Sequence, residues 1–239
     1  MKAVVLAGGK GTRLMPYTRV IPKPLMPIGD MSILEVLLHQ MKRAGVDEVI
    51  ITVGHMAGLL KAFFQDGKQL GLQIKYSLEN IPLGTAGPLS LIVPPPTETF
   101  LVLNGDVLTT LDLNDLLENH KHSKAIATIA AHERIEKIDY GVLEVDKDNV
   151  IKKYKEKPVN KYLVSMGIYV FEPDVLSYIP VNQYYDFPDL VCELIAHGEK
   201  AVSYPFQGYW QDLGRPDDYE QAVEDFEKMR AAFLEGVPK

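Results

Sequence analysis

The sequence predicts an α/β fold in which helices cover both faces of a central, mostly parallel β-sheet. Short apolar runs with the length of buried strands alternate with stretches of helical apolar spacing through the first half of the chain. Strands that alternate with helices in this way form βαβ units, whose parallel strands are buried on both faces. The length of 239 residues and the apolar content of 46% suffice for one sizeable core.

The first half contains the clearest elements. Strand-like runs are expected at residues 2–6, 48–53, 72–77 and 99–103. Ser32 with Glu35 three residues later forms a capping box, and apolar residues at helical spacing follow it. A second helix is expected at residues 57–65.

The second half changes character, because strand-like runs follow one another with only brief helices between them. These runs lie at residues 125–131, 141–145, 150–154 and 164–171. They predict antiparallel or mixed strands that extend the core and carry a second binding surface. A helix at 217–235 is expected to end the chain, with Phe226 and Phe233 on its apolar face. Because no linker is evident, we expect a single domain over 1–239.

Composition and charge narrow the possible partners. The formal net charge of −7 argues against a protein that binds nucleic acid, since such binding depends on clustered Lys and Arg. A small anionic ligand needs only a few local cations and backbone donors. Cys192 is the single cysteine, so neither an intramolecular disulfide nor a cysteine-based metal site is expected. No apolar run suits a signal peptide or a membrane span, which predicts a cytoplasmic protein without a membrane partner.

A glycine-rich turn, LAGGKGTRL at residues 6–14, follows the first strand directly. Ligands gather at the carboxyl ends of parallel strands, and glycines there let the backbone approach phosphate oxygens closely. The spacing is neither that of a dinucleotide-binding fingerprint nor that of a Walker A loop. The glycines alone are equally compatible with a turn that only connects two elements.

Two cations beside this turn favour a phosphate site. Arg13 lies two residues after the last glycine, and Lys23 follows in the segment IPKPLMPI, where prolines on both sides limit the backbone. Fixed positive charges of this kind stabilise the negative charge that develops on phosphoryl oxygens during transfer. We therefore predict that both cations face a polyphosphate.

AGGKGTRL and IPKPLMPI together resemble the signature of the sugar-1-phosphate nucleotidyltransferases, also called nucleotide-sugar pyrophosphorylases. The resemblance continues in order to about residue 220, through residues 83–87 (LGTAG), 104–106 (NGD), 140–141 (YG), 156–158 (EKP), 166–169 (MGIY) and 210–214 (WQDLG). It implies a Rossmann-like mixed sheet with an inserted sugar-binding strand region, the nucleotide-diphospho-sugar transferase fold. Residues 1–120 would form the nucleotide-binding half and 121–220 the sugar-phosphate-binding half.

The reaction that this resemblance implies joins a nucleoside triphosphate to a sugar 1-phosphate and releases pyrophosphate. Arg13 and Lys23 would be the catalytic residues, with Arg13 at the β and γ phosphates and Lys23 near the α-phosphate. Asp106 and Asp212 would bind Mg²⁺, which prefers carboxylate and phosphate oxygens. The implied nucleotide-binding set is Leu6, Ala7, Gly8, Gly9, Gly11, Thr12, Arg13, Lys23, Glu79, Gly84, Thr85 and Asp106.

The resemblance also implies a pocket for the sugar 1-phosphate, formed by Gly141, Glu156, Lys157, Ser165 and Asp212. Lys157 would bind the phosphate, and Glu156 would accept hydrogen bonds from sugar hydroxyls. Ser165 stands where relatives often have Asn, and its shorter side chain reads a different hydroxyl pattern.

The choice of base and sugar depends on residues 82–89 (PLGTAGPL), which look closest to the mannose-1-phosphate guanylyltransferases. Glu79 offers an acceptor for the N–H donors of guanine, so GTP and mannose 1-phosphate, or a related hexose or heptose, are favoured. UTP, dTTP and CTP remain alternatives, as do a non-sugar phosphate such as phosphocholine and a catalytically silent regulatory subunit that binds nucleotide sugars. Relatives suggest a homodimer or homotetramer. Many of them continue into a left-handed β-helix, which this chain is too short to contain.

Overall fold

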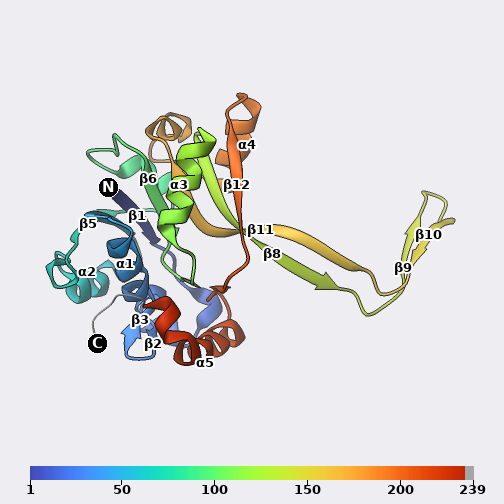
Figure 1. Ribbon diagram of the computed structural model, residues 1–239, viewed down its shortest axis with the longest axis horizontal. Coiled ribbons are helices and arrows are strands. Elements are labelled where there is room, and N and C mark those ends of the chain that lie inside the picture. Colours follow the sequence, from blue (N-terminus) through green and yellow to red (C-terminus); the bar gives the residue numbers. More distant parts are fainter. Residues whose placement is uncertain (235–239) are drawn as a thin grey trace.

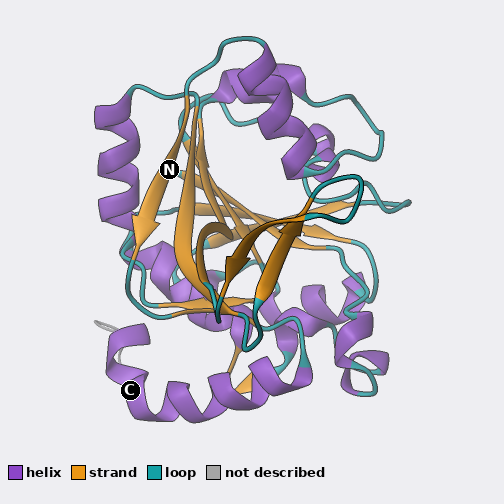
Figure 2. Ribbon diagram, turned by 90° about the vertical axis from the view of Figure 1, so that its right-hand side faces the viewer, coloured by secondary structure: helices purple, strands orange, loops and turns teal. Residues whose placement is uncertain are grey.

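The computed structural model describes residues 1–234, which form a twisted seven-stranded sheet with helices around it (Figure 2). The strand order is β12-β8-β11-β6-β1-β4-β5. The bounds, in chain order, are β1 Lys2–Ala7, β4 Glu48–Val53, β5 Gln73–Leu78, β6 Phe100–Asn104, β8 Ala127–Lys137, β11 Val159–Phe171 and β12 Ala201–Phe206.

The pairing within this sheet confirms a mixed, mostly parallel architecture. The strands β6, β1, β4 and β5 are parallel to one another, and β12 is parallel to β8. Only β11 runs antiparallel, and it does so to both β6 and β8. The two short strands β2 (Pro27–Ile28) and β3 (Met31–Ser32) form a separate hairpin, and β7 (Val107–Thr109) pairs with β13 (Trp210–Asp212).

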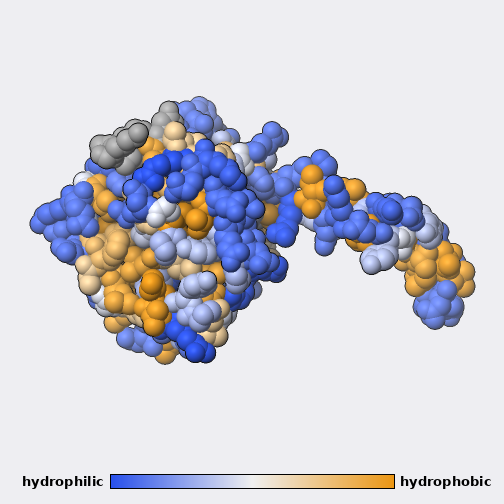
Figure 3. Space-filling view, turned by 90° about the horizontal axis from the view of Figure 1, so that it is seen from below, coloured by the Kyte–Doolittle hydropathy of each residue, from blue (hydrophilic) through white to orange (hydrophobic). Residues whose placement is uncertain are grey.

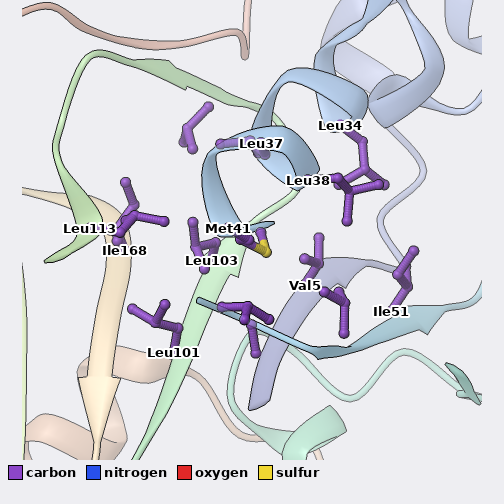
Figure 4. Close-up of a cluster of buried hydrophobic side chains, with 14 of the residues drawn as sticks. Val5, Leu34, Leu37, Leu38, Met41, Ile51, Leu101, Leu103, Leu113 and Ile168 are labelled. Atoms are coloured by element: carbon purple, nitrogen blue, oxygen red, sulfur yellow. The ribbon is translucent and has the colours of Figure 1, made fainter. Parts of the chain in front are cut away.

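Helices cover both faces of the sheet, as the alternating pattern predicts. On one face, α1 (Ile33–Arg43), α2 (Ala57–Phe64) and α3 (Leu113–Ser123) pack against the sheet. Figure 4 shows part of this core, in which Leu37, Leu38 and Met41 of α1 lie near strand side chains such as Val5 and Leu103. The other face is covered by α4 (Phe187–Ala196) and by the 3₁₀ segments η5 (Gly87–Leu91) and η6 (Pro173–Tyr178).

The expected capping box is present, since the Ser32 side chain accepts from the Glu35 N–H and Glu35 accepts from the Ser32 N–H. The last helix, α5 (Pro216–Phe233), confirms the predicted tail helix; residue 235 of that prediction lies outside the described residues. Its Ala222, Phe226 and Phe233 are buried in a third apolar cluster with Leu14 and Met26. Within residues 1–234, no helix combines the length and apolar character needed to cross a membrane.

Strands β8 and β11 leave the body as a long ribbon, visible at the right of Figure 1. Both run further than the sequence pattern predicts: β8 ends at Lys137 rather than at 131, and β11 begins at Val159 rather than at 164. Between them, β9 (Val142–Val145) and β10 (Ile151–Lys155) form a two-stranded tip. We call residues 133–163 the arm.

Candidate active site

The sheet brings the glycine-rich turn to the point where its strand order reverses. Strands β4 and β5 lie in that order on one side of β1, and the next strand of the sheet, β6, lies on the other side of β1. In open α/β sheets, ligands bind at the carboxyl ends of the strands at such a switch point. The backbones of β1 and β6 are joined there, because the Gly105 N–H donates to the Leu6 carbonyl at 3.0 Å.

A cavity of about 360 Å³ opens at this point. All twelve residues expected to contact the nucleotide line it, and so does Asp212. Six further residues line the cavity without having been expected at the nucleotide, namely Leu14, Pro24, Thr52, Pro88, Asn104 and Gly214; all but Thr52 lie within the motifs that carry the family resemblance. Asn104 could have been suspected, because it precedes Gly105 and Asp106 at the end of a strand.

The shape of the glycine-rich turn requires glycine at position 11. Gly11 has a φ of +61°, and a Cβ there would lie 2.9 Å from the Thr18 methyl carbon. The Thr18 hydroxyl donates to the Gly11 carbonyl at 2.7 Å, and the Leu14 N–H donates to the same oxygen at 3.0 Å. These bonds start the 3₁₀ turn η1 (Thr12–Leu14), which holds Arg13 at the cavity.

Lys23 is held between the two predicted metal aspartates. It begins the 3₁₀ turn η3 (Lys23–Leu25), and its side chain is only 9% exposed. Its ammonium forms an ion pair with Asp106 and lies 3.7 Å from the Asp212 carboxylate. The two aspartates meet because β13 pairs with β7, and because the Leu213 N–H donates to the Asp106 carbonyl at 3.1 Å.

The surroundings of Asp212 disfavour its charged form. Burial raises the pKa of Asp212, and the nearby Asp106 raises it further, whereas Lys23 and Arg13 act in the opposite direction. Among the described residues, no three His, Cys, Asp or Glu side chains gather as a ligand set. A hard divalent cation would therefore fit these two carboxylates only with oxygens from phosphates or water.

Hydrogen bonds attach the segment 83–87 to the start of α4. The Asp186 carboxylate accepts from the Thr85 N–H at 2.8 Å and from the Thr85 hydroxyl at 2.9 Å. Gly84 has a φ of +79°, and a Cβ there would lie 2.6 Å from the Tyr185 carbonyl oxygen. Burial opposes ionisation of Asp186, but hydrogen bonds from Tyr184 and Thr85 hold its pKa below the usual value. Asp186 could not be predicted as a site residue, because no sequence motif connects it with Thr85.

Glu79 lines the cavity and lies against Gly8 of the glycine-rich turn. Its carboxylate accepts from the Leu83 N–H at 3.2 Å, and burial raises its pKa although this hydrogen bond acts to lower it. A Cβ on Gly8 would lie 1.4 Å from the Glu79 Oε1 atom, so any side chain at this position would require the Glu79 carboxylate to move.

The residues expected to bind the sugar 1-phosphate are not brought together at the cavity. Gly141 and Glu156 do meet within the arm, where a Cβ on Gly141 would lie 3.1 Å from the Glu156 Oε2 atom. Gly141, Glu156 and Lys157 lie in the arm, and none of them lines the cavity. Glu156 accepts from the Tyr154 hydroxyl at 2.8 Å. Ser165 lies on β11 at the base of the arm, where it donates to the Tyr169 hydroxyl oxygen at 3.2 Å. Of this set, only Asp212 lines the cavity.

Sequence comparison identifies relatives over most of the chain. Residues 2–229 match the model of a family described as nucleotidyl transferase. A UTP–glucose-1-phosphate uridylyltransferase of Synechocystis sp. is 38% identical over 93% of this chain and 62% of its own length. A mannose-1-phosphate guanyltransferase of Pichia angusta is 36% identical over 92% of this chain and 62% of its own length. The chain thus spans about 62% of the length of these relatives.

Solved structures share the fold. A putative glucose-1-phosphate thymidylyltransferase from Bacillus anthracis superposes with a TM-score of 0.77 at 23% identity, over 100% of this chain and 97% of its own. HddC from Yersinia pseudotuberculosis, complexed with GMP-PN, gives a TM-score of 0.70 at 25% identity, over 94% of this chain and 99% of its own. The predicted fold and the family resemblance are both confirmed. The match over residues 2–229 and relatives above 30% identity establish that this protein belongs to the nucleotidyl transferase family.

Proposed function

We propose that the chain is a Mg²⁺-dependent nucleotidyltransferase that joins a nucleoside triphosphate to a sugar 1-phosphate. One observation carries the proposal: Lys23 lies between Asp106 and Asp212, beside Arg13 and a glycine-rich turn. Cations and backbone donors there suit a triphosphate, and two facing carboxylates suit a divalent cation. The similar proteins named as uridylyl- and guanyltransferases support the same reaction.

The reaction needs no nucleophile from the protein. A phosphate oxygen of the sugar 1-phosphate attacks the α-phosphorus, and the bond from that phosphorus to the β-phosphate oxygen breaks. Pyrophosphate leaves with the electron pair of that bond. The protein contributes position and charge neutralisation, with Arg13 at the β and γ phosphates and Lys23 at the α-phosphate.

Asp106 and Asp212 would hold the Mg²⁺ ion together with phosphate oxygens. The bound ion would neutralise charge on the transferring phosphate and orient it for in-line attack. It would also relieve the repulsion that raises the pKa of Asp212. Lys23 keeps the two carboxylates in place before the substrates bind.

For substrates, we propose GTP with mannose 1-phosphate or a related hexose or heptose 1-phosphate. Glu79 supports guanine, because its half-buried carboxylate offers acceptors to the N–H donors of that base. The guanyltransferase from Pichia angusta supports the same choice, whereas the uridylyltransferase from Synechocystis sp. favours UTP and glucose 1-phosphate.

The test crosses GTP, UTP, dTTP and CTP with a panel of sugar 1-phosphates and measures pyrophosphate release. We expect turnover that requires both substrates and Mg²⁺, with GTP preferred. A preference for UTP or dTTP would overturn the base assignment. Binding without turnover for every pair would instead favour a silent regulatory subunit, and turnover only with phosphocholine would contradict a sugar substrate.

A further inference from the structure

Three residues at the carboxyl ends of neighbouring strands form a strip under the cavity. Leu6 of β1 lies directly beside Asn104 of β6 on one side and Thr52 of β4 on the other. Neighbouring strands lie about 4.8 Å apart and residues in register share a face, so the three side chains are continuous with one another. All three line the cavity. A ligand that extends across the cavity from β4 to β6 therefore lies on this strip.

Asn104 is fixed from its other side by strand β11. That strand pairs with β6 through Ile168↔Leu103, which brings Gly167 opposite Asn104. Gly167 has a φ of +72°, and a Cβ there would lie 2.8 Å from the Asn104 Cγ atom. The absence of a side chain at position 167 thus leaves the Asn104 amide its place at the cavity.

The amide of Asn104 has no hydrogen-bond partner among residues 1–234, although the residue is half-buried. Other uncharged polar side chains at the cavity are already engaged. The Thr52 hydroxyl donates to the Val5 carbonyl at 3.4 Å, and the Thr85 hydroxyl donates to the Asp186 carboxylate at 2.9 Å. An amide offers both N–H donors and a carbonyl acceptor, and covering them without partners is unfavourable. A well-matched ligand therefore supplies an acceptor and a donor side by side, as two neighbouring hydroxyl groups do.

Asn104 lies between the two ends of the cavity. The end proposed for the base is beyond β4, since the Glu79 N–H donates to the Val53 carbonyl at 2.9 Å. The end proposed for the phosphates and Mg²⁺ begins two residues after Asn104, at Asp106 with its ion pair to Lys23. In a nucleotide, the ribose joins the base to the α-phosphate. It must therefore cross the middle of the cavity, where the Asn104 amide lies.

We propose that Asn104 binds the two ribose hydroxyls of the triphosphate and makes the site selective for ribonucleotides over deoxyribonucleotides. One amide N–H donates to one hydroxyl oxygen, and the amide carbonyl accepts from the neighbouring hydroxyl. The arm stands clear of the body (Figure 3), so the groups that face the ribose come from the cavity itself. This inference deepens the proposed function, on which it rests, and it counts against dTTP as the substrate.

Equilibrium binding tests this selectivity without turnover. Calorimetry in the presence of Mg²⁺ gives the dissociation constants of GTP, 2′-deoxy-GTP and 3′-deoxy-GTP, and of the matching uridine nucleotides if UTP binds more tightly than GTP. We expect the wild type to bind the ribonucleotide about tenfold more tightly than either deoxy form, because each missing hydroxyl leaves part of the amide unpaired. Asn104→Leu keeps a side chain of similar size without polar atoms, so it should bind all three forms within about twofold of one another.

The matched control, Asn114→Leu, makes the same substitution at an exposed position in the first turn of α3 and should keep the wild-type preference. A wild type that binds the ribo and deoxy forms equally would overturn the inference, whether or not the variant folds. So would an Asn104→Leu variant that retains the preference, or one that changes only the KM for the sugar 1-phosphate, since the amide would then face the other sugar ring.

The outcome also separates this inference from the proposed function. Turnover without a preference for ribonucleotides would refute the role of Asn104 alone. A preference for ribonucleotides that depends on Asn104, in a protein that turns over no substrate pair, would refute the proposed function alone. A protein that binds none of these triphosphates would refute both.

Discussion

Lys23 shows how a single side chain depends on its partners for both structure and function. Burying an ammonium group is costly unless opposite charges or hydrogen bonds compensate for lost water. Asp106 and Asp212 compensate in the described chain, and Lys23 in turn keeps two mutually repelling carboxylates close together. The same three charges would then be available to a triphosphate and its metal ion.

Removing Lys23 should therefore cost more activity than stability. For Lys23→Ala, we expect turnover to fall roughly 10²- to 10⁴-fold, because the positive charge that stabilises the transferring phosphate is lost. The free energy of unfolding should fall by only about 1–3 kcal/mol, because both aspartates keep access to water. Steady-state pyrophosphate release and urea unfolding measure the two effects. The control Lys121→Ala removes an exposed lysine of α3 and should leave both quantities near wild type; turnover of Lys23→Ala within threefold of wild type would refute the role of Lys23.

Glu79 gives a prediction for pH. Because burial raises its pKa above the usual 4.5, folding favours its protonated form. The stability gained from that form is fully present below pH 4.5 and is lost as the pH rises through the raised pKa. We expect Glu79→Gln, which cannot ionise, to become progressively more stable relative to wild type as the pH rises across this window, then to level off. Urea unfolding of both proteins at a series of pH values measures this difference, and a difference that is flat or falls with pH would contradict it.

Among the elements, the segment 83–87 illustrates how a loop gains a defined shape from a distant helix. Asp186 at the start of α4 accepts two hydrogen bonds from Thr85, and the Tyr185 carbonyl accepts from the Ala86 and Gly87 N–H groups at 2.9 Å each. These hydrogen bonds hold Gly84 and Thr85 at the cavity without a ligand. They would therefore reduce the conformational entropy that the loop loses when a nucleobase binds.

Removing the hydrogen bonds between Asp186 and Thr85 should weaken nucleotide binding without weakening the binding of the sugar 1-phosphate. For Asp186→Ala, we expect the KM for the nucleoside triphosphate to rise about tenfold, the cost of one or two charge-assisted hydrogen bonds. The KM for the sugar 1-phosphate should stay within about twofold, since the arm is untouched. Asp189→Ala, which removes an exposed carboxylate in the first turn of α4, serves as the matched control. Equal changes in both KM values would mean that Asp186 supports the fold rather than the loop.

Elements buried on both faces could be predicted to within a residue or two from the sequence. Strands β1, β4 and β6 are examples, because apolar residues make up most of their length. The outer parts of β8 and β11 could not be predicted in this way. Their side chains are exposed, so no burial pattern marks where the strands end. Helices α3 and α4 were also not predicted from the sequence.

At the scale of the whole molecule, the fold brings together segments that the sequence cannot connect. The glycine-rich turn, Lys23 and Asp106 could be assigned to one site from their types and positions after strands. The partnership of Asp106 with Asp212 could be inferred only from a family resemblance, because it depends on the pairing of β13 with β7. The arm is the opposite case, since Gly141, Glu156 and Lys157 were expected beside the cavity and lie away from it.

If this chain transfers a nucleotidyl group to a sugar 1-phosphate, a label on the α-phosphate of the triphosphate must follow that group into the product. The protein is incubated with GTP labelled at the α-phosphorus, mannose 1-phosphate and Mg²⁺, and the products are separated. We expect the label in a nucleotide-diphosphate sugar, in equal amount with the pyrophosphate released, and we expect Asp106→Asn to abolish this transfer. Label recovered as free nucleoside monophosphate, or left in the triphosphate with every nucleotide and sugar tried, would contradict it.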